Sequence, residues 1–94
     1  MALARVVSFD GVSNDRVAEM QRDMQGEEQP EGLNATEIIM LHDPDGEKSL
    51  VILFFENEDD YRQGDAVLNA MPAGDTPGKR SGVDKYHVAH RMTT

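Results

Sequence analysis

The chain has 94 residues, with no cysteine and no tryptophan, and carries a formal net charge of −9 at pH 7. This length predicts a single domain over residues 1–94. The missing cysteine excludes disulfides, thiolate metal sites and a cysteine nucleophile, and it fits a cytoplasmic location. The acidic balance argues against a nucleic-acid partner, because phosphate binding needs clustered Lys and Arg residues.

We also expect no membrane partner. No apolar run approaches the roughly 18 residues that a membrane-spanning helix needs. The first segment, MALARVVSFDG, has Arg5 where a signal peptide needs an unbroken apolar core. We therefore interpret it as mature sequence.

The first part of the chain predicts a strand and then a helix. Residues 3–9, LARVVSF, are rich in β-branched and apolar types, which favour a strand. Ser13 is placed to cap a helix over residues 14–25, with Val12 before it as the outer half of a hydrophobic staple. Gly26 in the acidic link that follows can end this helix. The apolar residues of this helix recur at the spacing of a single face, which we expect to be buried: Val17, Met20 and Met24.

The middle of the chain predicts two strands joined by a turn. Residues 35–42, ATEIIMLH, form the second strand, and the turn DPDGEK offers Gly46 for a positive φ. Asp43 and Asp45 in this turn lack the twelve-residue spacing of a calcium loop, so we predict no metal there. Residues 49–55, SLVILFF, form a third strand that is apolar on both faces and must be covered on both sides.

The segment ENEDDYRQGDAVLNAMP predicts a second helix with Asn57 as N-cap and acidic residues in its first turn. Pro72 ends it. The following loop, AGDTPGKRSG, is not a nucleotide-binding P-loop, because Arg80 stands between the lysine and the serine. The last strand is predicted over about residues 84–92. The buried face of the helix is expected to consist of Tyr61, Val67, Leu68 and Met71.

The order strand–helix–strand–strand–helix–strand predicts an α+β fold, the ferredoxin-like βαββαβ plait with an antiparallel four-stranded sheet. In that topology the first and third strands are central and both helices cover one face. The other face still carries apolar side chains. A second copy of the chain is the simplest cover for it, so we expect a homodimeric α+β barrel.

The chain resembles the dimeric α+β-barrel superfamily, which includes the antibiotic biosynthesis monooxygenase and stress-responsive barrel families. Small actinobacterial members are most similar in the segments EG before the second strand, FFE and GDAVLNAM around the second helix, and TPGKRSGV before the last strand. The resemblance implies a cavity between the sheet and helices of each subunit. It implies one of two functions. One is oxygenation of a small aromatic or polyketide-like molecule without cofactor, metal or flavin. The other is a non-enzymatic dimer that binds a small apolar or aromatic ligand or serves as a stress-associated structural protein.

The haem-degrading branch of the superfamily uses Asn, Trp and His residues, contributed partly by the second helix. We do not carry this activity over, because the chain has no Trp and no histidine on a predicted helix.

The C-terminal segment VDKYHVAHRM supplies the candidate catalytic residues. His87 and His90 point to opposite faces of a regular strand, so they cannot bind one metal together. His90 shares the more apolar face with Tyr86, which makes His90 a candidate base and Tyr86 a second candidate catalytic residue. An ordinary structural role is the alternative for His90.

Two further residues are candidates for ligand binding. Arg5 lies in a predicted central strand, where a buried charge needs a partner. Three arrangements would satisfy the charge of Arg5: an ion pair with Glu37, a bound anionic ligand, or snorkelling of the side chain to the strand end. His42 stands beside Asp43, which could orient it as a base. Because adjacent strand residues face opposite ways, a structural role for His42 is the alternative.

Overall fold

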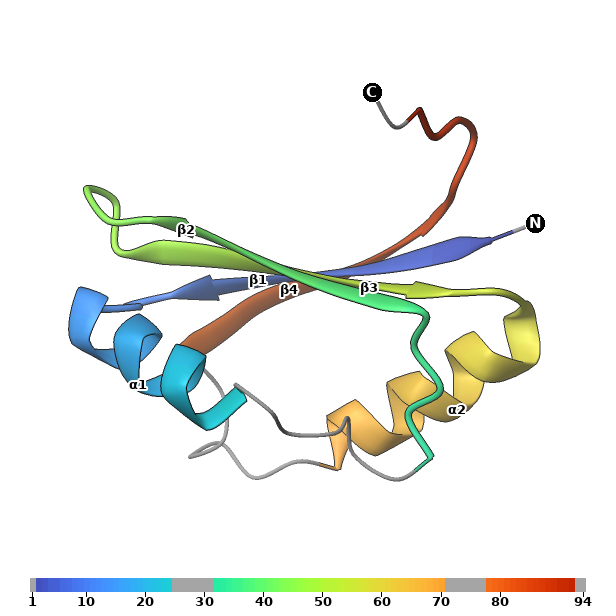
Figure 1. Cartoon of the computed structure of the whole chain (residues 1–94), viewed down its shortest axis with the longest axis horizontal. Helices are drawn as coiled ribbons and strands as arrows, with labels where there is room; N and C mark the ends of the chain where they lie inside the picture. Colours follow the sequence, from blue (N-terminus) through green and yellow to red (C-terminus); the bar gives the residue numbers. More distant parts are fainter. Residues whose placement is uncertain (1, 25–31, 71–77, 93–94) are drawn as a thin grey trace.

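The protein is described by a computed structural model covering residues 2–24, 32–70 and 78–92. Its elements follow the predicted order (Figure 1). They are β1 (Leu3–Asp10), α1 (Asn14–Met24), β2 (Glu37–Asp43), β3 (Lys48–Phe55), α2 (Glu58–Asn69) and β4 (Lys79–His87). Among the helices in these ranges, none is both long and apolar enough to cross a membrane.

The strands form one sheet in the order β2-β3-β1-β4, and each neighbouring pair is antiparallel. The central position of β1 and β3 is confirmed. Both helices lie on one side of the sheet (Figure 1). This α+β arrangement is compatible with the ferredoxin-like plait.

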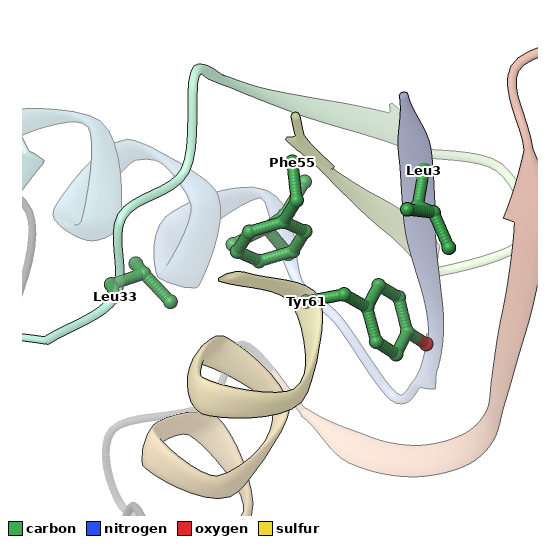
Figure 2. Packing of buried hydrophobic residues seen from close by; sticks show 5 residues of the cluster. Leu3, Leu33, Phe55 and Tyr61 are labelled. Carbon is green, nitrogen blue, oxygen red and sulfur yellow. The ribbon is translucent and has the colours of Figure 1, made fainter. Parts of the chain in front are cut away.

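The main core lies between the sheet and α2. The rings of Phe55 and Tyr61 meet edge to face, with 5.6 Å between their centroids (Figure 2). A smaller cluster of Val7, Phe9 and Val12 lies under α1, which contributes Val17. The main cluster consists of Leu3, Leu33, Leu53, Phe55 and Tyr61.

The helix starts agree with their sequence signals. The Asp60 backbone N–H donates to Asn57 Oδ1 at 2.8 Å, and the Arg16 N–H donates to Ser13 Oγ at 3.1 Å. Each bond satisfies one of the amide groups that a helix leaves without a partner at its N-terminus. Val17 packs against the cluster that contains Val12, which is compatible with the predicted staple.

The last strand differs from its prediction. It begins at Lys79 and ends at His87, whereas residues 84–92 were expected. Lys79 and Arg80 pair with the end of β1 across a register shift at Ser8/Phe9. This segment is polar and shows no alternation of apolar residues in the sequence. It joins the sheet because its backbone pairs with β1.

In the turn after β2, Glu47 takes the positive φ (50°) that was expected of Gly46. Asp43 explains the difference, because its Oδ1 accepts the Gly46 N–H at 3.2 Å and holds the turn from its first residue. The predicted cap at Gly26, the acidic link after it, Met71 and Pro72 lie outside the described residues.

Candidate functional site

The face of the sheet opposite the helices, here termed the open face, carries apolar side chains on its two central strands and on parts of both edge strands. Residues opposed in an antiparallel ladder share a face, so the register gives its composition. Leu41 is 50% exposed, Leu50 37% and Tyr86 55%. The open face comprises the rows Glu37–Phe54–Ala4–Tyr86, Ile39–Ile52–Val6–Asp84 and Leu41–Leu50–Ser8–Gly82.

A charged row closes the open face at the end nearest the β2–β3 turn. Asp43, Lys48, Asp10 and Lys79 follow one another across the four strands, so that acidic and basic side chains alternate. Lys48 Nζ lies 3.9 Å from Asp43 Oδ2, at the limit of an ion pair, and both side chains are exposed. Such a pair is weak in water and can exchange its partner for another charged group.

A half-open depression of about 410 Å³, here termed the cavity, lies beside this row. This volume falls within the range of small-molecule pockets. Three apolar residues and six polar or charged residues line it. The lining residues are Ser8, Phe9, Asp10, Leu41, His42, Asp43, Lys48, Ser49 and Leu50.

His42 is half-buried at the cavity. Its Nε2 lies 3.2 Å from the backbone oxygen of Val12. Because a carbonyl oxygen can only accept, Nε2 carries the hydrogen, and in the neutral ring Nδ1 is left as the acceptor. His42 therefore joins β2 to the segment before α1, which is a structural contact, and it also lines the cavity. Its ligand-binding role stays a prediction.

The two candidate catalytic residues lie elsewhere. Tyr86 stands on the open face at the β4 edge, opposite Ala4. His90 is exposed and follows the end of β4, so the strand alternation that grouped it with Tyr86 does not extend to it. That part of the prediction is wrong, because the strand ends at His87. Neither candidate is among the residues that line the cavity.

Arg5 is buried on the helix side of the sheet, with 2% of the residue exposed. Its Nε donates to Asp65 Oδ1 at 2.8 Å, and its Nη2 donates to Asn69 Oδ1 at 3.1 Å. The predicted partner Glu37 lies on the opposite face, and the burial of Arg5 rules out snorkelling. Both of these alternatives are wrong for one reason: the charge is satisfied by α2, which the strand pattern alone does not place. Ligand binding by Arg5 stays a prediction.

Further polar contacts on the helix side also attach α2 to the sheet. Arg80 Nη1 donates to Asn69 Oδ1 at 2.9 Å. Lys85 donates to Glu58 Oε1 at 2.6 Å, and its ammonium lies 5.0 Å from the centre of the Tyr61 ring. The hydrogen bond from Lys85 lowers the pKa of Glu58. Burial, and then the carboxylate of Asp65, raise the pKa of Tyr61.

The sequence reasoning missed one contact on the open face. Arg91, which follows β4, pairs with the carboxylate of Glu37 on β2. Its guanidinium carbon also lies 5.0 Å from the centre of the Phe54 ring. The only available signal was a basic residue within the predicted last strand, and this does not indicate a partner on another strand.

Within the described ranges, no group of three or more His, Asp or Glu residues is arranged to hold a metal ion. No family model, curated protein or solved structure matches the chain. The candidate site therefore rests on the geometry of the open face and its cavity.

Proposed function

We propose that the protein is a homodimer, an α+β barrel in which two sheets pack through their open faces, and that this dimer binds a small, largely apolar or aromatic molecule. The observation that carries the proposal is an apolar open face with a cavity at one end. Monomeric proteins rarely expose large contiguous apolar patches, and those that do occur usually serve an interface or a ligand.

The dimer follows from the need to cover β3. Leu50, Ile52 and Phe54 stand on the open face in the middle of the sheet. Packing two sheets face to face, about 10 Å apart, removes such side chains from water. A two-fold axis lets one patch cover its own copy. Each copy carries a net charge of −9, so added salt should favour association by screening the repulsion.

The cavity supports the ligand half of the proposal. Leu41 and Leu50 offer apolar contact, while Ser8 and the charged row offer a few polar groups at the rim. A compact molecule with an aromatic or aliphatic body and one polar end matches this lining.

An oxygenase would be the catalytic form of the same dimer. Tyr86 and His90 do not line the cavity, so a bound molecule there would lack both candidate residues. We therefore propose binding without oxygenation.

Native mass spectrometry of the freshly purified protein tests this function. We expect a dimer with a reproducible added mass that Ser8→Phe removes by filling the cavity. Ser81→Phe, which adds the same ring at an exposed position outside the cavity lining, should keep the added mass. Equal ligand uptake by the two variants would contradict the cavity as the site. Oxygen consumption with the identified ligand would favour the oxygenase instead.

A further inference from the structure

The chain that follows β4 turns towards the open face instead of continuing the strand. The Val88 N–H still donates to the Ala2 oxygen at 2.9 Å. Beyond it, residues 88–92 rise from the sheet on the side away from the helices (Figure 1). We term these residues the C-terminal segment.

The Arg91 side chain connects this segment to strands on the other side of the sheet. β4 is one edge strand and β2 is the other, with β1 and β3 between them. The Arg91 side chain reaches Glu37 on β2 and passes Phe54 on β3. Neighbouring strands lie roughly 4.8 Å apart, so three spacings come to about 14 Å. Because Val88 is still hydrogen-bonded to Ala2, the three residue steps from Val88 to Arg91, about 10 Å when extended, and the arginine side chain together make this crossing.

We propose that the C-terminal segment is a strap that closes one end of the open face in the single chain and must be displaced before a second copy can dock. The strap thereby limits self-association. This inference rests on the proposed dimer, because it assigns a regulatory element to the same face.

The C-terminal segment and a second copy of the chain cannot occupy the same end of the open face at once. Packed sheets lie about 10 Å apart and their side chains fill that layer. The Arg91 guanidinium, held over the Phe54 ring, occupies part of the layer that the second sheet would take.

The contacts of the strap are weak enough to be displaced. The Arg91 side chain is 55% exposed and that of Glu37 is 39% exposed, so solvent screens their ion pair. An exposed ion pair and an exposed cation–π contact each favour closure by only a few-fold. A dimer needs an open strap on both chains. The apparent affinity is therefore reduced by the square of the fraction of chains whose strap is open.

Two opposite charge changes test the strap. Arg91→Ala and Glu37→Gln both break the ion pair, but one removes a positive charge and the other a negative charge. If the strap competes with the second copy, both variants should lower the dimer dissociation constant, by roughly tenfold or more. Sedimentation equilibrium at one salt concentration measures this constant. The matched controls Arg22→Ala and Glu56→Gln make the same charge changes at exposed positions off the open face and should stay within about twofold of the unmodified chain.

A charge swap adds a second check. The double variant Glu37→Arg with Arg91→Glu recreates the pair and should restore a dissociation constant close to that of the unmodified chain. A dimer that Arg91→Ala and Glu37→Gln leave unchanged, or weaken, would overturn the strap.

Failure of the dimer itself is recognised separately. If no variant associates at any concentration, the proposed dimer is wrong, and the strap is then judged on the monomer. Release of the strap should raise the fluorescence of an added apolar dye, anilinonaphthalene sulfonate, in Arg91→Ala and Glu37→Gln but not in the controls. Unchanged dye fluorescence in both variants would overturn the strap as a cover of the open face.

Discussion

At the scale of single residues, Arg5 explains most about how the sheet and α2 are joined. It is a charged side chain in a central strand, and its guanidinium is buried against Asp65 and Asn69. Such a pair adds little net stability over a well-packed apolar pair, but removing one partner leaves a buried charge. Arg5 thus helps to hold α2 in its position on the sheet. Its side chain donates hydrogen bonds to two residues of that helix.

The two partners should respond unequally to substitution. Asp65→Ala leaves the Arg5 charge buried, and we expect it to lower the free energy of unfolding by on the order of 2–3 kcal/mol. Arg5→Met keeps the volume and leaves Asp65, whose side chain is 37% exposed, able to hydrate, so its cost should be within about 1 kcal/mol. Urea denaturation compares them. A larger loss for Arg5→Met would contradict this account.

Glu58 predicts a pH dependence. Its pKa is lowered from 4.5 by the hydrogen bond from Lys85, so its contribution to stability is present above pH 4.5 and is lost as the pH falls below that value. Glu58→Gln should therefore lower Tm slightly at pH 7 and have a smaller effect at pH 3. In a Lys85→Met background this pH-dependent difference should disappear. An equal effect of Glu58→Gln at both pH values would show that the pair does not shift the pKa.

The same residues mark the limits of sequence reasoning about the site. The pattern places Arg5 on the buried face with Leu3 and Val7, and the structure confirms this. It does not place Asp65, because the rotation and position of α2 over the sheet depend on tertiary packing. His90 was misassigned because its face was deduced from a strand that ends three residues earlier, at His87.

At the scale of elements, the start of α2 is explained by local signals in the sequence. Asn57 caps the helix and acidic residues occupy its first turn, so its beginning was predictable. The start of β4 was not, since its Lys and Arg residues carry no apolar alternation and join the sheet through backbone pairing with β1.

Gly64 sets how closely α2 approaches the sheet. A Cβ atom at this buried position would lie 2.5 Å from Phe55 Cε1 and 3.0 Å from the Leu33 oxygen. Glycine in a helix interior costs roughly 0.5–1 kcal/mol relative to alanine. The packing gain must exceed this cost, because the alanine methyl group would push α2 off the core.

Gly64→Ala should therefore destabilise the protein by about 1–3 kcal/mol despite the better helix propensity of alanine. Gly82→Ala on β4 is the matched control, since its Cβ would meet nothing within 4 Å. Thermal unfolding of both variants measures the difference. A Gly64→Ala variant as stable as the unmodified chain would mean that α2 is not held this closely.

At the scale of the whole molecule, the arrangement leaves one side of a small sheet without a cover. The helices bury Leu3, Val7 and Phe55, while Leu41, Leu50 and Tyr86 remain exposed on the opposite side. The order of the elements and the apolar third strand predicted this imbalance. The strap formed by residues 88–92 was not predictable, because its contact joins opposite edges of the sheet.

We propose the open face as the surface through which two copies associate, and sedimentation equilibrium of two matched variants tests this proposal. Leu50 on the open face is 37% exposed and Val83 on the helix side of β4 is 38% exposed, so each can be replaced by Glu from a similar starting exposure. We predict that the unmodified chain is a dimer, that Leu50→Glu is a folded monomer because two buried charges would meet across the interface, and that Val83→Glu remains a dimer. An unmodified chain that is monomeric at all concentrations, or a Leu50→Glu variant that dimerises as well as Val83→Glu, would contradict the account.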